Sequence, residues 1–152
     1  MMKILCICHA NICRSFMAQE FLKQLLPGET VFSRGLYADP SYEVPQKVKE
    51  ALATHGIAFT AHTSTPLSVR DLAQADLIFC MESAQAERLL DRYAQYTDKI
   101  WLLTDFAFDT PQDLPDPIGL EGRAFAKQAQ RLYKACQAAA QRIKNQPQGE
   151  TV

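Results

Sequence analysis

A cysteine and an arginine near the N-terminus have the side chains and the spacing needed to bind and attack a phosphate group. The segment from Cys8 to Ser15 reads CHANICRS, with Arg14 six residues after Cys8. A thiolate is a strong nucleophile, and a guanidinium forms planar, bidentate hydrogen bonds with phosphate oxygens. The pair alone is a weak signal, so its meaning depends on the elements that position it.

The residues on either side place this segment between a buried strand and a helix. Residues 3–8 form a short apolar run, which is typical of a buried strand. From Arg14 onward, apolar side chains recur at helical spacing until Pro27-Gly28 ends the pattern. The N–H groups of the connecting loop then converge at the positive end of a helix, where an anion is stabilised. The same field favours a thiolate at Cys8, which is therefore predicted to be a nucleophile.

The rest of the chain alternates strand and helix patterns. Three further strands are predicted at residues 30–33, 77–81 and 100–103. Helices are predicted at 44–55 and 68–73, from an N-cap at Ser83, and in an Ala-rich stretch that ends near 143, after an Asp- and Pro-rich loop at 105–122. This order predicts a single α/β domain over 1–152, with a four-stranded parallel twisted sheet, helices on both faces and a frayed tail at 145–152. Ligands bind such folds at the C-terminal ends of the strands, where the loop after Cys8 lies.

The composition argues against nucleic acid and membranes as partners of this protein. The 152 residues are 47% hydrophobic, and 16 basic residues nearly balance 17 acidic ones. We therefore expect a monomer that binds no nucleic acid and no membrane, and we find no apolar run of membrane-spanning length and no secretory signal pattern. Five cysteines are an odd number, which favours reduced thiols and a cytoplasmic location. Cys6, Cys8, His9 and Cys13 lack a second Cys/His pair to complete a metal site, so no metal or other cofactor is expected.

Five separated motifs resemble, in the same order, those of the low-molecular-weight protein tyrosine phosphatase family. They are Cys8 to Ser15, Ser33-Arg34-Gly35, His62-Thr63-Ser64, Ala75 to Ile78, and Asp116-Pro117. The resemblance covers nearly the whole chain and implies the same α/β fold. It also implies hydrolysis of phosphotyrosine in proteins through a phosphocysteine on Cys8, with Arg14 and the loop amides binding the phosphate.

The leaving oxygen needs a proton, and a carboxylic acid on a loop over the site can supply it. Asp116 is the candidate because it lies between two prolines that stiffen the chain. The residues alone leave Asp105, Asp109 and Asp113 open as alternatives. The resemblance assigns the role to Asp116, first as general acid and then as base for the hydrolytic water.

Supporting roles follow from the same comparison. The phosphate-binding loop comprises His9, Ala10, Asn11, Ile12, Cys13, Arg14 and Ser15. Asn11 is expected to hold strained loop backbone through its side chain, and the Ser15 hydroxyl to hydrogen-bond the thiolate. The resemblance implies that Ser33 and His62 support Asn11. Without the resemblance, a histidine such as His62 is more often structural than catalytic.

Several positions depart from the family pattern. Ala10 replaces a Gly, Phe16 replaces a Pro, and Thr65 replaces a basic residue. Ile118 follows Asp116-Pro117, where the family usually has an aromatic residue that forms a wall against the substrate ring. We expect Ile118 and Tyr42 to form this wall, with Tyr37 and His9 as further candidates, and selectivity for phosphotyrosine is the weaker part of the prediction.

Other readings remain open at this point. Ile12 argues mildly against a phosphoarginine phosphatase, because members of that branch tend to carry Thr there. A thioredoxin-coupled arsenate reductase shares this type of loop and would need a relay cysteine such as Cys80. An oxyanion-binding protein without turnover is the third reading. Cys13 could also trap oxidised Cys8 as a disulfide.

Overall fold

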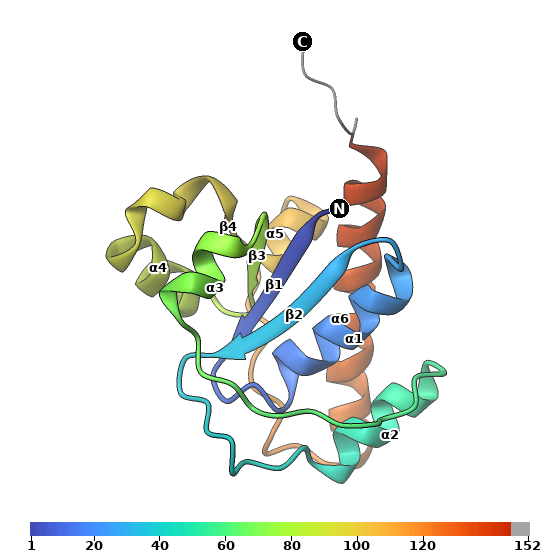
Figure 1. Cartoon of the computed structure of the whole chain (residues 1–152). Coiled ribbons are helices and arrows are strands. Elements are labelled where there is room, and N and C mark those ends of the chain that lie inside the picture. Colours follow the sequence, from blue (N-terminus) through green and yellow to red (C-terminus); the bar gives the residue numbers. More distant parts are fainter. Residues whose placement is uncertain (147–152) are drawn as a thin grey trace.

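A parallel sheet of four strands forms the centre of the molecule. In the computed structural model, which describes residues 1–146, the strands are β1 (Lys3–Cys8), β2 (Thr30–Gly35), β3 (Leu77–Cys80) and β4 (Ile100–Leu102). Their order across the sheet is β2-β1-β3-β4, and all three pairings are parallel. The predicted fold class is therefore confirmed (Figure 1).

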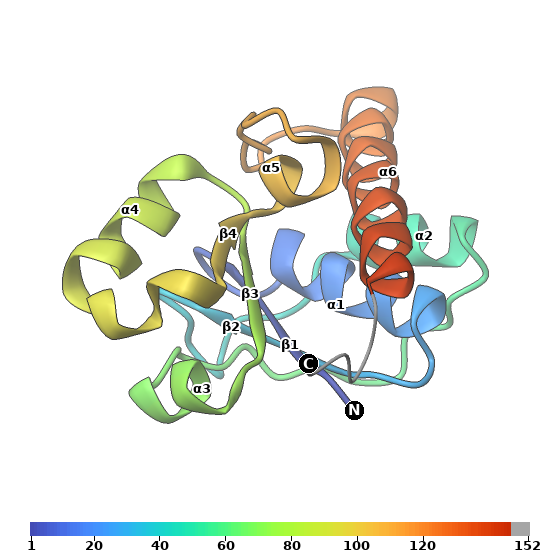
Figure 2. The same cartoon turned by 90° about the horizontal axis from the view of Figure 1, so that it is seen from above.

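Helices cover both faces of this sheet. They are α1 (Arg14–Leu25), α2 (Gln46–Thr54), α3 (Val69–Gln74), α4 (Ser83–Arg92), α5 (Leu103–Phe108) and α6 (Gly122–Asn145), with a 3₁₀ helix at Ala94–Lys99. Successive residues of β1 point to opposite faces. Ile4, Cys6 and Cys8 join the larger core under α1, α5 and α6, while Leu5 and Ile7 join a smaller core under α3 and α4 (Figure 2).

The topology places the loop after β1 at the point where the strand order reverses. The chain leaves β1 to form β2 on one side and later β3 on the other side. Cys8, the last residue of β1, pairs with Gly35 at the end of β2. A crevice opens at this kind of switch point because the connections leave in opposite directions.

Several helix and strand boundaries in the structure differ from the predicted ones. β4 ends at Leu102 and the predicted 105–122 loop begins with α5, while the 3₁₀ helix at 94–99 is an element that the pattern did not predict. The N-cap of α4 is Glu82 rather than Ser83, and Gln85 accepts a hydrogen bond from the Glu82 N–H at 3.0 Å. Of the predicted frayed tail, Asn145 is still helical, and residues 147–152 lie outside the described residues. No helix within 1–146 is long and apolar enough to cross a membrane.

Candidate active site

Asn11 organises the loop between β1 and α1. It is fully buried and has a left-handed backbone conformation with φ of 60°, which Asn tolerates better than most residues. Its side-chain amide donates to the hydroxyls of Ser15 (2.8 Å) and Ser33 (2.9 Å), and its side-chain oxygen accepts from the Thr65 N–H (3.0 Å). The contact between Ser33 and Asn11 that the resemblance implies is therefore present, whereas the contact between Asn11 and Ser15 was not predicted.

Two side chains from the segment before α3 hold the loop carbonyls. His62 Nε2 lies 2.7 Å from the Asn11 carbonyl and donates to it, since a carbonyl can only accept. The Ser64 hydroxyl donates to the Ala10 carbonyl at 2.7 Å. Phe16, which stands where the family has Pro, stacks on the His62 ring at 4.0 Å. His62 thus supports the backbone of Asn11, and burial lowers the pKa of its imidazole.

Gly35 lets β2 approach the same loop closely. The N–H groups of Leu36 and Tyr37 donate to the carbonyls of Cys8 (3.0 Å) and His9 (2.8 Å). A Cβ on Gly35 would lie 2.7 Å from the His9 carbonyl oxygen, closer than real contacts allow. Every loop carbonyl from Cys8 to Asn11 is thus engaged by surrounding structure, which leaves the loop N–H groups available to an anion in the pocket. The motif analysis noted Gly35 without giving it this role.

Cys8 lines the pocket, and its thiol lies beside a buried hydroxyl. Its Sγ lies 2.9 Å from the Ser15 Oγ, and when Cys8 is ionised the hydroxyl donates to the thiolate. All five cysteines are free thiols. Burial raises the pKa of Cys13 to about 12, with the negative charge of Cys8 as a second cause, and burial also raises the pKa of Cys80 to about 12. A disulfide between Cys8 and Cys13 stays a prediction.

Arg14 joins the loop to two other parts of the molecule. Its side chain is 4% exposed, its Nη1 donates to the Leu114 carbonyl at 2.9 Å, and it pairs with the carboxylate of Glu82. Its Nη2 lies 3.7 Å from Asp116 Oδ2. Its Nε is buried and has no hydrogen-bond partner within the described residues. A buried donor left unpaired costs free energy, so an anion that meets this N–H gains from it.

Glu82 is a site residue that the sequence analysis missed. It follows β3, the strand next to β1, so its carboxylate reaches Arg14 from the neighbouring strand end. A charged residue directly after the predicted strand 77–81 was the available signal. Because Ser83 was predicted as the N-cap of the helix, Glu82 was not considered as a residue of the site.

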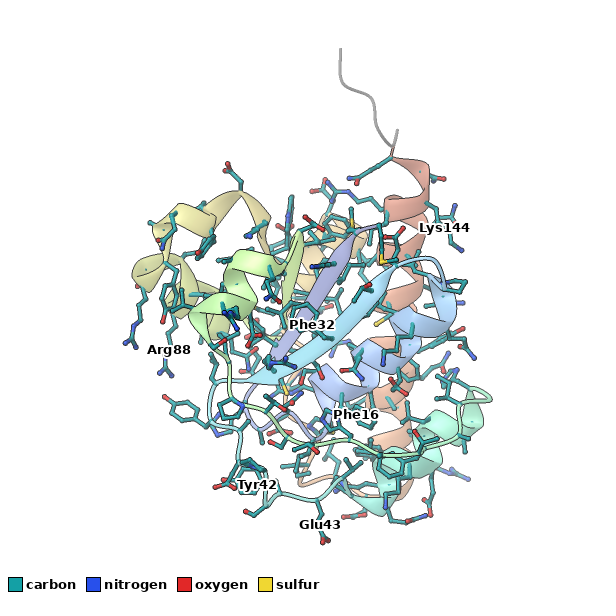
Figure 3. The ribbon with its side chains drawn as sticks, viewed as in Figure 1. Phe16, Phe32, Tyr42, Glu43, Arg88 and Lys144 are labelled. Carbon is teal, nitrogen blue, oxygen red and sulfur yellow. The ribbon has the colours of Figure 1, made fainter. Side chains whose placement is uncertain are left out.

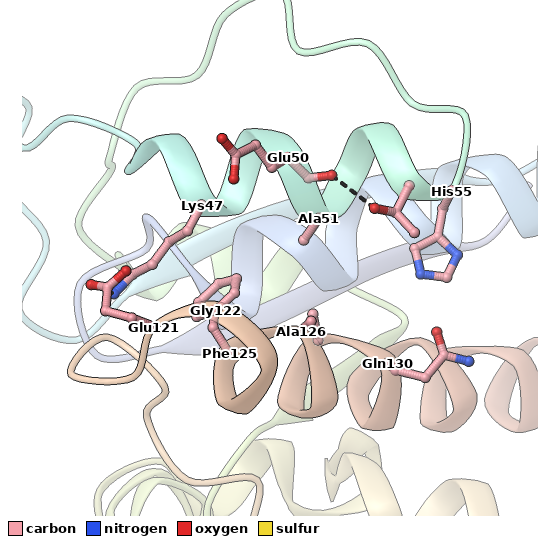
Figure 4. Close-up of a pocket in the computed structure, with 11 residues that line it drawn as sticks. Lys47, Glu50, Ala51, His55, Glu121, Gly122, Phe125, Ala126 and Gln130 are labelled. Carbon is pink, nitrogen blue, oxygen red and sulfur yellow. Dashed lines mark hydrogen bonds and ion pairs between the residues drawn. The ribbon is translucent and has the colours of Figure 1, made fainter.

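The loop that carries Asp116 is held more loosely. The Asp116 side chain is 41% exposed, and its Oδ1 accepts from the Ile118 N–H at 3.1 Å. Lys47, on α2, donates to the carbonyls of Ile118 and of Leu120 (2.8 Å), and it pairs with Glu121 at 3.0 Å. Figure 4 shows Lys47 extending from α2 toward Glu121 beside α6. Lys47 was also missed, because it lies about seventy residues from the loop that it contacts.

The loop and Asp116 enclose a cavity of about 190 Å³. Its lining consists of residues 8–14 with Asp116 and Ile118. Asp116 is the carboxylate that lines it within residues 1–146, whereas Asp113 accepts from Ser83 instead. Tyr42 is exposed in the segment between β2 and α2 and is outside this lining (Figure 3), so its part in a substrate wall stays a prediction. Ala10 has no positive φ, so its methyl group is compatible with the loop.

No group of three or more His, Cys, Asp or Glu side chains within residues 1–146 is arranged to hold a metal ion. The pocket instead offers a thiol, a buried guanidinium and a facing carboxyl group. These groups suit the transfer of a phosphoryl group to sulfur and then to water, which is the chemistry of cysteine-dependent phosphatases.

Comparison with known proteins agrees with this class. Residues 3–149 match the family model for low molecular weight phosphotyrosine protein phosphatase, so the chain belongs to this family of phosphatases. The predicted resemblance is thereby confirmed.

The chain is similar to several named bacterial relatives. A probable low molecular weight protein-tyrosine-phosphatase, EpsP, of Ralstonia nicotianae is 33% identical, and the match covers 93% of this chain and 95% of the relative. The structure of the arginine phosphatase YwlE of Geobacillus stearothermophilus superposes with a TM-score of 0.88 at 28% identity, covering 95% and 94% of the two chains. Wzb of Vibrio vulnificus, solved with benzylphosphonate, has a TM-score of 0.83 at 30% identity, covering 92% and 97%. A protein-arginine-phosphatase of Bacillus subtilis is also among the relatives.

Proposed function

We propose that this phosphatase hydrolyses phosphotyrosine in proteins through a phosphocysteine formed on Cys8. The position of Arg14 is the observation that carries the proposal. Arg14 belongs to the phosphate loop, and its Nη2 lies 3.7 Å from Asp116 Oδ2 across the pocket. One buried cation thus lies between the nucleophile's loop and the candidate acid. A phosphate ester placed against Arg14 has the thiol on one side and the carboxyl group on the other.

The proposed reaction has two steps. In the first, Cys8 Sγ forms a bond to phosphorus while the bond to the leaving oxygen breaks, and Asp116 gives that oxygen its proton. Arg14 and the loop N–H groups stabilise the charge on the equatorial oxygens. In the second, water attacks the phosphocysteine, Asp116 takes the proton, and the sulfur leaves as a thiolate that the Ser15 hydroxyl stabilises.

Phosphoarginine is the second candidate substrate, since arginine phosphatases are among both the sequence and the structure relatives. Two features favour phosphotyrosine. Ile118 lines the cavity and offers an apolar surface to a ring. The second feature is Ile12, because the resemblance described above implies Thr at this loop position in a phosphoarginine phosphatase.

An arsenate reductase relay is harder to build from these residues. Cys80 is fully buried at the end of β3, in the smaller core, while Cys8 and Cys13 belong to the larger core on the other face of the sheet. A disulfide between Cys80 and Cys8 would have to form through the sheet. We also propose that the partner is a phosphoprotein, that the protein is a monomer and that it is located in the cytoplasm. Five unpaired thiols support the last of these, because the cytoplasm keeps thiols reduced.

The test compares wild type with Cys8→Ser and Asp116→Asn on an aryl phosphate. We expect Cys8→Ser to lose roughly four orders of magnitude in kcat or more, because no thiolate attacks phosphorus. Asp116→Asn should lose about 10²- to 10⁴-fold, with the larger loss for substrates whose leaving group is more basic. Turnover by Cys8→Ser at the wild-type rate would disprove the mechanism.

Substrate class is tested on matched peptides. The ratio of kcat/KM for phosphotyrosine, phosphoarginine and phosphoserine peptides of one sequence should favour phosphotyrosine. Arsenate reduction is measured alongside with thioredoxin present. A preference for phosphoarginine would keep the two-step chemistry and change the substrate.

A further inference from the structure

A second groove, of about 390 Å³, opens directly beside the catalytic pocket. His9, Arg14 and Asp116 line both spaces. The far wall of the groove comes from α4 and from the residues after β2, namely Leu36, Tyr37, Ala84, Gln85 and Arg88. Because the two spaces share a wall, a peptide whose phosphorylated side chain enters the pocket has neighbouring residues within reach of this groove.

Tyr37 holds the guanidinium of Arg88 in this groove. The Arg88 Cζ lies 4.9 Å from the centre of the Tyr37 ring, and Arg88 Nη1 donates to the Tyr37 hydroxyl. Tyr37 in turn packs against the His9 ring at 4.7 Å, and its N–H donates to the His9 carbonyl at 2.8 Å. The three side chains form a continuous row from the rim of the phosphate loop to α4, and Arg88 projects from α4 at the surface (Figure 3). The position of the Arg88 charge is thus tied to the position of the loop.

Within residues 1–146, the carboxylates around the groove leave Arg88 without an ion-pair partner. The Glu82 carboxylate is paired with Arg14, and Asp116 lies 3.7 Å from Arg14 as well. Among the residues that the structure describes, no carboxylate lies within 4.0 Å of Arg88. A guanidinium held in place by an aromatic ring and left without an anion is suited to bind a carboxylate or a phosphate.

We propose that Arg88, positioned by Tyr37, forms a subsite for an anionic side chain close in sequence to the phosphorylated residue of the substrate. The inference rests on the proposed function, because it takes the catalytic pocket to hold the phosphorylated side chain. An extended peptide advances about 3.3–3.6 Å per residue, so the anion belongs within a few residues of the phosphorylated one. The subsite acts on both ground state and transition state, and it therefore lowers KM and leaves kcat nearly unchanged.

The test uses phosphotyrosine peptides that differ at one flanking position. Glu is placed in turn at each of the three positions on either side, against a peptide with neutral flanks. For wild type, Glu at the favoured position should lower KM about five- to tenfold relative to the neutral peptide, and this preference should weaken as salt is raised. In Arg88→Gln the ratio of the two kcat/KM values should fall to near one, and Arg88→Lys should keep part of it.

Arg92→Gln is the matched control. Arg92 is one turn further along α4 and its guanidinium also lies over a ring, that of Tyr93 at 5.8 Å, but it does not line the groove. Its ratio should stay at the wild-type value. An equal loss of preference in Arg88→Gln and Arg92→Gln would assign the effect to general charge and overturn the subsite. A preference for the Glu peptide that survives in Arg88→Gln would also overturn the subsite.

Two further measurements separate the outcomes. Peptide binding to the Cys8→Ser protein measures the subsite without turnover, so a failure of the proposed reaction does not obscure it. A peptide with a second phosphotyrosine in place of Glu distinguishes the source of the anion. Preference for the second phosphate alone would assign the subsite to multiply phosphorylated substrates, and absence of both preferences in wild type would reject it.

Discussion

Two loops meet at Arg14, and they are held in place in different ways. The loop from Cys8 to Ser15 is largely buried, and two other segments, β2 and residues 62–65, bind its backbone and its central Asn11. The residues next to Asp116, from Leu114 to Leu120, are largely exposed, and they are held from outside by Lys47, by Arg14 and, at the Leu114 N–H, by the Met81 carbonyl. The anion-binding half of the site is therefore built into the core, whereas the proton-donating half is attached by long side chains.

This difference has a physical reason. Backbone N–H groups stabilise a phosphoryl transition state only when they already point at it, so their loop must be rigid before the substrate arrives. An acid has to reach the leaving group and then water, and a largely exposed segment with few bonds to the core next to Asp116 allows such small adjustments. Changes in the first loop should therefore damage both folding and catalysis, while changes in the second should mainly damage catalysis.

The largest effect is expected for Asn11→Ala. The change removes three hydrogen bonds, two of them buried, and leaves a residue that disfavours the left-handed conformation of the loop. We expect kcat to fall about 100-fold because the N–H groups lose their alignment, and the free energy of unfolding to fall by about 2–3 kcal/mol. Turnover of an aryl phosphate and urea unfolding measure both. Asn145→Ala, at an exposed position on α6, is the control, and equal effects of the two changes would contradict the prediction.

Gly35→Ala should come next. Its added methyl group would meet the His9 carbonyl, so β2 and the loop must move apart, at a cost of about 1–3 kcal/mol in unfolding free energy. Activity should fall with it, by about tenfold, because the shifted carbonyl belongs to the phosphate loop. Thermal unfolding and turnover are compared with those of Gly28→Ala, whose Cβ would meet nothing within 4 Å. A wild-type melting temperature for Gly35→Ala would show that the space between Gly35 and the His9 carbonyl can accommodate a methyl group.

A smaller effect, confined to catalysis, is expected for Lys47→Met. This variant keeps most of the length of the unbranched side chain and removes the donor to the Ile118 and Leu120 carbonyls. We expect kcat to fall roughly three- to tenfold, through poorer placement of the acid loop, with little change in stability. The loss should grow as the leaving group becomes more basic, since such substrates depend more on Asp116. Lys49→Met, on the same helix but over the Phe59 ring, is the control. A loss that is the same for all leaving groups would argue against a role through Asp116.

The smallest effect is the pH dependence contributed by His62. Burial lowers its pKa from the ordinary 6.5, so the folded protein binds fewer protons than the unfolded chain between the lowered pKa and 6.5. Stability should therefore fall as the pH drops below about 6.5 and level off once His62 is protonated in both states. Urea midpoints at pH 7.5 and 5.0 should differ less in His62→Gln than in wild type.

His55 gives the contrast to His62. Burial lowers its pKa as well, and its ring stacks on Tyr133 at 3.9 Å, at the end of α2 away from the phosphate loop. His55→Gln should reduce the pH dependence of stability without changing kcat, whereas His62→Gln should change both. Identical kinetic effects of the two variants would remove the link between His62 and the loop.

Much of this protein follows from local pattern. The run 3–8, the helix after Arg14 and the strand-helix alternation predict the sheet and the loop, because apolar periodicity reflects which face of each element is buried. Asp116 was predicted as the acid, and it is the carboxylate that lines the cavity within residues 1–146. The boundary errors at Ser83 and at α5 arise where helix and strand signals adjoin, and there tertiary contacts select the end of each element.

The residues that pattern did not reveal act across long separations. Glu82 contacts Arg14 from 68 positions away, and Lys47 contacts Leu120 from 73 positions away. Arg88 meets Tyr37 across 51 positions. Side chains like these have no periodicity that singles them out among other surface charges, and only the packing of α2 and α4 around the sheet brings them to the site. The residues and chemistry of the phosphate loop can therefore be predicted from neighbouring positions in the sequence. The contacts that support the Asp116 loop and the second groove depend on elements that meet only in the folded chain.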